Sequence, residues 1–517
     1  MILSIAVVSM SGEHLRRLSV EAELLGSHLI DIIMAKHYKE GAVGSLRYNL
    51  EHICRQRTLA EQGMVDGSRL TIIWEPLDVR HASAIADRLL AGGEVSDADM
   101  DVYHSIRELH YPSGKVPLPQ HLRNLTYGDS FNRSLEGTLF PVSLRTLKFG
   151  QAFDQSLDNT TLPCNLRSLT FGMRFNRRLD KTVLPSSLES LTFGMLFNQP
   201  LDATHLPSSL RNLTFDMYFN QSLEFTILPS GLHMLVFGDN FDQSLDNTTL
   251  PCNLRSLTFG RAFAQPLDNA ILPSGLQSLE FYHSLYNTIL PSSLQNLTFG
   301  EEFNASLENT TLPSGLQSMT FGRCFNQSLD NVTLPQSLRS LMFGHCFDKS
   351  LNNTTLPHGL ESLTFGVNFN QNFDAVTLPC GLQHLTFGLC FMQSLQHATL
   401  PSGLKSFTLA GYWVNMAATI LPDGLQHLTL DTMFDQSLAN IPLPNGLQTL
   451  RFGHHFNQSM DDTNLPIGLR ELTFGFSFNH SVDNMTFPIR LEYLTFHRNY
   501  GRSLAAVPSK VCILFAD

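Results

Sequence analysis

Residues 250–271 read LPCNLRSLTFGRAFAQPLDNAI, and this stretch of 22 residues decides the fold of most of the chain. Leu257, Thr258 and Phe259 alternate apolar, polar and apolar, which is the period of a β-strand. Pro251 cannot lie in a central strand, so it marks the corner before the strand. Gly260 predicts the corner after it, where glycine would supply backbone angles that other residues avoid. The stretch therefore predicts one short strand, a tight corner and a return path.

This unit recurs from Leu118 to the end of the sequence. A proline opens each unit, and the step between prolines is 22 residues except between Pro273 and Pro291 (18) and between Pro401 and Pro422 (21). One unit is too short to bury its own apolar side chains, so neighbouring units must stack. The repeat predicts a mainly β, parallel β-solenoid of about 18 rungs over residues 118–517.

Stacking places equivalent residues in columns. The second phenylalanine of each unit, such as Phe263, is predicted to form a buried spine, because a ligand-binding stripe would vary more. The Asn or Asp that usually follows it is predicted to hydrogen-bond turn backbone in its own or the next rung. The residue after the late leucine is acidic in twelve units, among them Asp158 and Asp246. Two interpretations of this acidic row remain open: its members are solvated turn residues, or they hold a row of weakly bound cations.

The outward face of the strands is the predicted partner-binding surface. Its middle position is threonine in thirteen rungs, and the row is interrupted by Lys148, Val236, Glu280, Met342 and Arg451. An arginine stands before several of the strands. A partner would distinguish the face by these interruptions and arginines, although drift at outward positions explains them as well.

The two shortened units carry unusual aromatic residues, which favour protein interfaces. Tyr282, His283 and Tyr412 are not explained by the spine and are predicted to lie on the surface. Leu285 and Trp413 stand at the spine's offset from the proline and are predicted to continue it. The candidate partner-binding residues are Arg123, Arg145, Lys148, Arg167, Arg211, Arg255, Glu280, Tyr282, His283 and Tyr412.

The sequence contains no nucleophile elbow, phosphate loop or HExxH motif. His345 stands at a variable loop position that is typical of a solvated side chain. The acidic run 97–108 matches four positions of an EF-hand loop, but Val102 replaces the glycine that such a loop needs. We therefore expect no enzymatic activity, no cofactor and no bound metal.

The composition excludes two classes of partner. A net charge of −12 argues against nucleic-acid binding, and no apolar run approaches the ~20 residues that cross a bilayer. The eight cysteines lack paired metal spacing, and the segment 1–13 lacks the pattern of a signal peptide. Asn-x-Ser/Thr triplets arise from the repeat itself, as in FNQS. We expect a cytoplasmic or nuclear protein that is not secreted.

The unit LPxxLxxLTFGxxFNQSL resembles the FNIP repeat, a 22-residue relative of the leucine-rich repeat. Residues 197–200 read FNQP and match the repeat's core, while most units carry Ser in place of the proline, as in FNQS at 325–328. The resemblance implies a leucine-rich-repeat-like solenoid and a protein-binding role. Many relatives carry an F-box and act as ubiquitin-ligase adaptors, but this sequence shows no F-box.

Residues 1–76 resemble a small α+β ubiquitin-like (β-grasp) domain. The segment 3–13 is typical of a strand and hairpin turn, 20–39 would include the helix, and 57–73 is similar to the end of ubiquitin. Conjugation is not expected, because the chain continues without a diglycine tail, so the domain would be a docking module. Residues 77–117 are predicted to form a helical connector that caps the first rung, with a capping box at Ser96 and Asp99.

These features predict a scaffold for protein–protein interaction, with ubiquitin-ligase or proteasomal components as potential partners of its N-terminal end. The alternative is a structural or ice-binding-like solenoid without a ubiquitin link, for which a flat threonine ladder would be typical. An enzyme is the third class, and no convergent catalytic set supports it.

Overall fold

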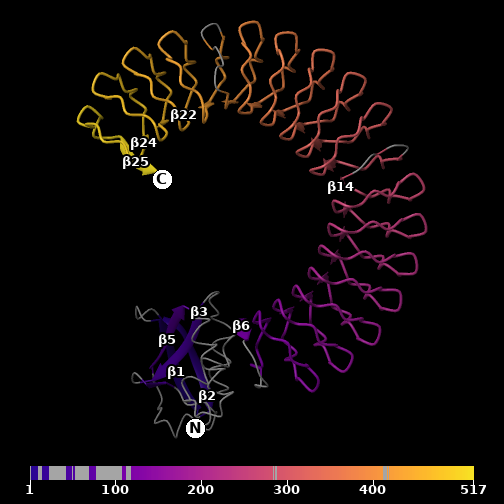
Figure 1. Cartoon of the computed structure of the whole chain (residues 1–517). Helices are drawn as coiled ribbons and strands as arrows, with labels where there is room; N and C mark the ends of the chain where they lie inside the picture. The colour runs from indigo at the N-terminus through magenta and orange to yellow at the C-terminus, as the bar shows by residue number, and fades with distance from the viewer. Residues whose placement is uncertain are drawn as a thin grey trace. The chain divides into compact units, whose positions relative to one another are not determined.

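The computed structural model describes most of the repeat region and the strands that precede it. It covers residues 2–9, 14–21, 42–48, 51–52, 69–76 and 108–111, and residues 118–516 except 283–284, 286–287, 412–415 and 417–418. The chain divides into two compact units, Met1–Leu232 and His233–Asp517 (Figure 1). No helix among these residues is long and apolar enough to cross a membrane.

The first unit begins with a mixed five-stranded sheet. Its strands are β1 (Ile2–Ser9), β2 (His14–Glu21), β3 (Ala42–Tyr48), β4 (Glu51–His52) and β5 (Arg69–Pro76), in the order β2-β1-β5-β3-β4. β1 runs parallel to β5, and the other neighbouring pairs are antiparallel. The helix predicted within 20–39 lies outside the described residues.

The same unit continues into the parallel ladder of the repeats. Its strands are β6 (Glu108–Tyr111), β7 (Asn124–Tyr127), β8 (Thr146–Lys148), β9 (Ser168–Thr170), β10 (Ser190–Thr192) and β11 (Asn212–Thr214). From β7 onward each residue pairs with the residue 22 positions later. β6 lies in the segment predicted as a helical connector and pairs with β7, so the ladder begins before Leu118. The rest of that connector lies outside the described residues.

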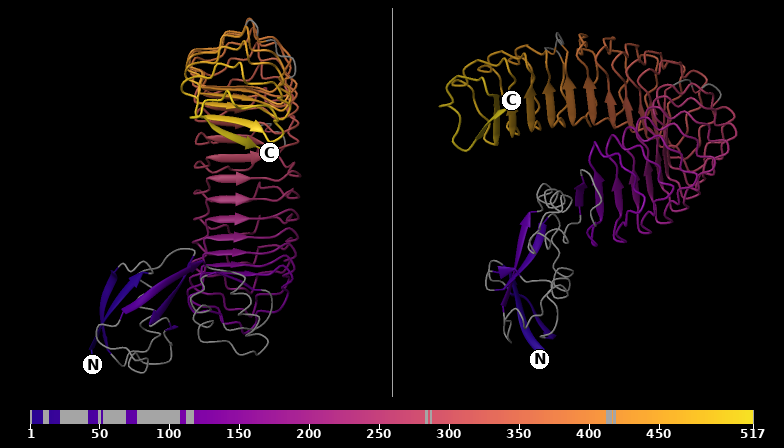
Figure 2. Two further views of the ribbon diagram at one scale, coloured as in Figure 1. Left: turned by 90° about the vertical axis from the view of Figure 1, so that its left-hand side faces the viewer. Right: turned by 60° about the horizontal axis from the view of Figure 1, so that its bottom comes forward.

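The second unit consists entirely of repeats, and its strands line the inner side of the curved stack (Figure 1). They are β12 (Met234–Val236), β13 (Ser256–Thr258), β14 (Ser278–Phe281), β15 (Asn296–Phe299), β16 (Ser318–Thr320), β17 (Ser340–Met342), β18 (Ser362–Thr364), β19 (His384–Phe387), β20 (Ser406–Leu409), β21 (His427–Leu430), β22 (Thr449–Phe452), β23 (Glu471–Thr473), β24 (Tyr493–His497) and β25 (Cys512–Ala516). Figure 2 shows the strands side by side, with the return paths behind them. The predicted parallel solenoid is confirmed: the 18 prolines that open its units bound about 17 turns.

The core of each rung lies between its strand and its return path. Leu254, Leu257 and Phe259 are at most 1% exposed, so the predicted alternation is confirmed. Two phenylalanine columns interlock behind the strands. Phe193 and Phe197 stack with ring centroids 3.8 Å apart, and Phe197 lies 6.0 Å from Phe219 of the next rung. The predicted spine is therefore a buried stack of aromatic rings, which contributes dispersion and apolar burial along each unit.

The Asn or Asp after the spine phenylalanine joins neighbouring rungs. Asn176 Oδ1 accepts the backbone N–H of Asn198 (2.9 Å) and a side-chain N–H of Gln199 (3.1 Å). Asn198 Oδ1 accepts the equivalent bonds from Asn220 and Gln221, each 3.0 Å long. Of the two predicted arrangements, the structure has the bond to the next rung. This ladder satisfies backbone donors that the short strands leave unpaired.

The corner glycines serve another purpose than the sequence predicted. The described glycine with a positive φ is Gly137, at +75°, and the corner glycines adopt ordinary backbone angles. A Cβ atom on Gly172 would instead lie closer than 3.0 Å to the carbonyl oxygen of Gly150 in the preceding rung. The same overlap recurs at Gly194 and Gly260. The prediction of special angles was wrong: glycine is needed because the backbones of adjacent corners touch.

Candidate functional site

The shortened unit between Pro273 and Pro291 changes the return path and leaves the strands in register. β14 pairs in parallel with β13 and β15, residue by residue. On the return side, the Thr288 N–H donates to the Leu285 carbonyl oxygen (2.9 Å), as Thr160 does to Leu157 in a regular unit. Leu285 therefore occupies the late-leucine position. Its predicted place in the spine was wrong, because the four missing residues lie before it.

This unit has no described spine phenylalanine, and the neighbouring rings adjust. Phe281 is tilted by 59° against Phe299 and by 71° against Phe303. In regular units the equivalent rings lie nearly parallel, as Phe321 and Phe343 do at 3°. These tilted rings adjoin the shortened unit, which identifies the place where the regular stack changes.

Tyr282 takes the place of the corner glycine in this unit. Its ring packs against Gly300 of the next rung so closely that a Cβ on Gly300 would overlap the ring. The Tyr282 hydroxyl donates a hydrogen bond to Glu280 Oε1 over 3.4 Å. Two predicted site residues are thus brought together by one irregular corner.

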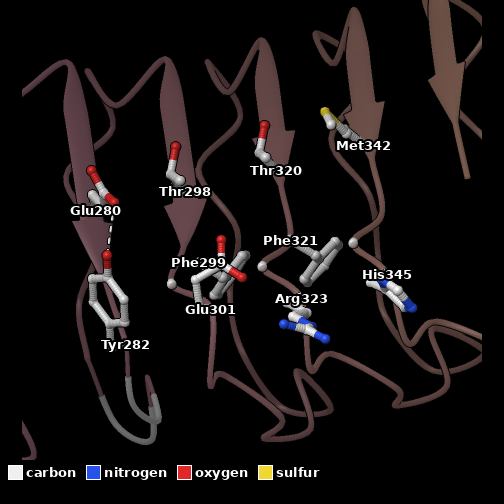
Figure 3. A pocket seen from close by; sticks show the side chains of 13 residues that line it. Glu280, Tyr282, Thr298, Phe299, Glu301, Thr320, Phe321, Arg323, Met342 and His345 are labelled. Carbon is white, nitrogen blue, oxygen red and sulfur yellow. Dashed lines mark hydrogen bonds between the residues drawn. The ribbon is translucent and has the colours of Figure 1, made fainter. Parts of the chain in front are cut away.

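These residues begin a shallow hollow of about 560 Å³ at the carboxyl ends of β14–β17, here called the Tyr282 hollow. The outward strand positions supply Glu280, Thr298, Thr320 and Met342, and the corners supply Tyr282, Glu301, Arg323 and His345. Figure 3 shows the two sets as parallel rows, with Phe299 and Phe321 between them. Glu280 and Met342, two of the predicted interruptions of the threonine row, stand at its two ends.

Partial burial alters the acid–base behaviour of the hollow. Desolvation raises the pKa of Glu280, and the hydrogen bond from Tyr282 opposes part of that rise. Desolvation also raises the pKa of Tyr282, and the Glu280 charge and hydrogen bond add to it. The phenol therefore stays protonated at neutral pH and remains a hydrogen-bond donor.

The hollow has the chemistry of a binding surface. It offers a phenol, a guanidinium group, an imidazole, two carboxylates and a thioether, with the Met342 residue 46% exposed. Nearby, burial and Glu302 raise the pKa of the Cys324 thiol, which is the opposite of what a nucleophilic cysteine needs. In the described parts of the chain, no three His, Cys, Asp or Glu side chains gather as metal ligands would. The arrangement can hydrogen-bond and pack against a partner.

The structure separates the other candidate residues. Arg123, Arg145 and Arg167 line a second hollow in the first unit, and Lys148 is exposed on β8 beside them. Arg211 and Arg255 are exposed at the same repeat position. His283, Tyr412 and Trp413 lie outside the described residues, so their predictions stay untested.

Sequence reasoning missed three residues of the Tyr282 hollow. Glu301, Arg323 and His345 each follow a corner glycine, and His345 was predicted to be merely a solvated loop residue. Their side chains come together because consecutive units place this variable position in one column. The signal that could have found them is that column of varied, polar residues beside the irregular unit.

The acidic row lies in turns. The Asp158 and Asp246 backbone N–H groups each donate to a serine hydroxyl two residues earlier, over 3.1 Å. The serine of FNQS thereby shapes the turn and leaves the carboxylates exposed. This geometry agrees with the prediction of solvated turn residues. At Asp158 and Asp246 it does not arrange ligands around a cation.

A family model and one solved structure agree with this architecture. A family model described as "FNIP Repeat" matches residues 153–195, 197–240, 241–284, 283–324, 325–368, 369–411, 417–455 and 456–499. Among solved structures, CroV588, described as a novel circular LRR protein, is 33% identical with a TM-score of 0.64, over 80% of this chain and 67% of that one. A structure of the Toll–Spatzle complex from Drosophila is 14% identical with a TM-score of 0.43, over 83% of this chain and 60% of that one. No curated protein matches the sequence.

Proposed function

Because the chain belongs to the FNIP repeat family, we propose that it is a non-enzymatic scaffold that holds a protein partner at the Tyr282 hollow. Repeat solenoids of the leucine-rich kind generally bind proteins. The observation that carries the proposal is the hollow that begins with Glu280 and Tyr282 of the 18-residue unit and ends at Met342, three rungs later. The regular units around it have threonine and glycine at the first two of these positions.

The hollow favours a partner that inserts an apolar side chain flanked by polar groups. Tyr and Arg are the residues on which interface energy concentrates, and Met adapts to the shape of its neighbour. The Arg323 guanidinium offers donors, and Glu280 and Glu301 offer acceptors. The Tyr282 hydroxyl, whose proton is donated to Glu280, offers its oxygen as a further acceptor. An extended or looped segment of the partner could pair with these donors and acceptors while it covers Met342.

The test is affinity capture with the full-length chain, followed by mass spectrometry. The double substitution Tyr282→Ser with Arg323→Ser is expected to weaken capture of the specific partner about tenfold or more. Arg323 is exposed and Tyr282 is half-buried, so the melting temperature should fall by no more than a few degrees. The matched control is Tyr218→Ser. Tyr218 is a tyrosine outside the hollow with an exposed fraction of 44%, and its substitution is expected to leave capture intact. Unchanged capture by the double variant would refute the proposal and favour a structural solenoid.

A purely structural, threonine-ladder solenoid is less well supported at this site. Thr298 and Thr320 stand between Glu280 and Met342, so the row of threonines around the hollow is only two residues long. A charged group and a large thioether interrupt the regular array of hydroxyls that such a surface would need.

We further propose that residues 1–76 are a ubiquitin-like docking module. The order β2-β1-β5-β3-β4, with β1 and β5 parallel at its centre, supports the β-grasp resemblance. Deletion of residues 1–76 is expected to leave the β-type circular dichroism signal of the repeats intact, while capture of ubiquitin-ligase or proteasomal components is lost. Equal capture by the shortened chain would contradict the docking role, and collapse of the signal would contradict the separability of the module.

A further inference from the structure

Three arginines of the first unit form a second surface that the Tyr282 hollow does not explain. Arg123, Arg145 and Arg167 each stand immediately before a strand, on three consecutive rungs. Their backbones are fixed at this point: the Arg123 carbonyl oxygen accepts the N–H groups of Arg145 (2.7 Å) and Thr146 (2.9 Å). The three arginines, here called the arginine strip, line a hollow of about 360 Å³.

The arginine strip carries positive charge that the described residues neutralise only at Arg167. Arg167 pairs with Glu189 of the following rung, with nitrogen and oxygen 3.4 Å apart. For Arg123 and Arg145 the neighbour on the following rung is another arginine, and neither forms an ion pair with a described residue. Lys148 adds a fourth cation on the outward face of β8. Like charges held side by side favour the binding of an anion between them.

The same repeat position shows elsewhere what kind of anion it accepts. Arg339 pairs with Glu361 at 3.5 Å, and Arg470 pairs with Glu492 at 3.6 Å. Both pairs join one rung to the next, as Arg167 and Glu189 do. When the equivalent position on the next rung is glutamate, the stacking of the rungs places its carboxylate within reach of the arginine. For Arg123 and Arg145 no described residue supplies that carboxylate, so a partner molecule can provide it.

The serine hydroxyls on the floor of the hollow are bonded to backbone, and the guanidinium groups are its charged donors. The Ser143 and Ser187 hydroxyls each lie within hydrogen-bond distance of two main-chain carbonyl oxygens, 2.6 to 2.7 Å away, so the single proton of each hydroxyl is taken up by backbone. Asn165 Nδ2 donates to the Val142 carbonyl oxygen at 3.0 Å. Planar guanidinium groups recognise carboxylates through paired N–H bonds.

We propose that the arginine strip binds an extended, Asp/Glu-rich segment of a protein partner that crosses β7–β9. Rungs lie ~4.8 Å apart, and carboxylates on one face of an extended chain recur every ~7 Å, so two or three of them meet three long, flexible arginines. Glu189 ends the surface, because it neutralises Arg167 and presents a negative charge to whatever continues past it. This proposal stands independently of the Tyr282 hollow.

The experiment uses the full chain and a fluorescent peptide of alternating glutamate and serine, with binding followed by polarisation at low and physiological salt. The triple variant Arg123→Gln, Arg145→Gln, Arg167→Gln is expected to lose binding. Glu189→Gln is expected to strengthen it severalfold, because Arg167 is released. Arg470→Gln removes an arginine at the same repeat position in the other unit and should change nothing, while circular dichroism verifies the fold of each variant.

Three results would overturn the proposal. The triple variant could retain the peptide, or a peptide of alternating glutamine and serine could bind equally well, which would exclude recognition of carboxylates. Alternatively, a single-stranded oligothymidylate could bind where the glutamate peptide does not, which would identify nucleic acid as the occupant. A failure of the Tyr282 variants in partner capture would leave this result unaffected, so the two proposals can fail separately.

Discussion

Replacing Phe197 with alanine is expected to lower the free energy of unfolding by about 4 kcal/mol, the range for large aromatic truncations in a core. Phe197 is fully buried and stacks on Phe193 in its own rung and on Phe175 and Phe219 in the adjacent rungs. The truncation opens a cavity between three rungs whose hydrogen-bond ladders prevent collapse. Denaturant unfolding followed by circular dichroism measures the loss.

The control for this substitution is Phe225→Ala, which removes the same side chain where it is 73% exposed. Its effect should stay within about 0.5 kcal/mol. If Phe197→Ala were as mild as Phe225→Ala, the stacked spine would not contribute to the stability of the first unit.

Gly172→Ala is expected to cost about 3 kcal/mol, although it adds only one methyl group. The new Cβ would overlap the carbonyl group of Gly150, which is backbone and cannot rotate away as a side chain would. Asp216 occupies the equivalent corner after β11, so a rung can admit a Cβ once its neighbours have adjusted. Gly172 lies between Gly150 and Gly194, where the backbones are in direct contact. Hydrogen exchange of the amides in β8–β10 would report the local loosening.

Gly501→Ala provides the comparison, because a Cβ there meets no atom within 4 Å. It should be nearly neutral, within about 0.5 kcal/mol. Equal effects at Gly172 and Gly501 would show that the corners can separate without loss, and that glycine serves some other purpose in the repeat.

The regular rung could be predicted from the sequence because its period is renewed in nearly every unit. Leu257 and Phe259 reveal the strand by their alternation, and the recurrence of phenylalanine at the spine position in nearly every unit identifies it as core. The function of Gly172 could not be predicted, since one glycine after a strand is equally compatible with unusual angles and with close contact. Only the distance between neighbouring corners distinguishes the two.

Part of the candidate site could be predicted from the sequence, because some of its residues depart from the repeat pattern and others do not. Glu280 and Tyr282 stand out because they break a pattern. Arg323 and His345 do not, because the residue after the corner glycine varies in every unit and carries no signal by itself. Leu285 was misplaced because counting from the proline assumes that the missing residues lie after it. The structure instead shortens the path between the corner and the late leucine.

The unbroken pairing of β13, β14 and β15 across the 18-residue unit has an evolutionary consequence. A loss of four residues on the return side left every strand pair of that region in register. Insertions and deletions in a single repeat can therefore be sampled by mutation without disturbing the adjacent repeats. New specificities in this architecture can thus arise one repeat at a time, while the rest of the array keeps folding as before.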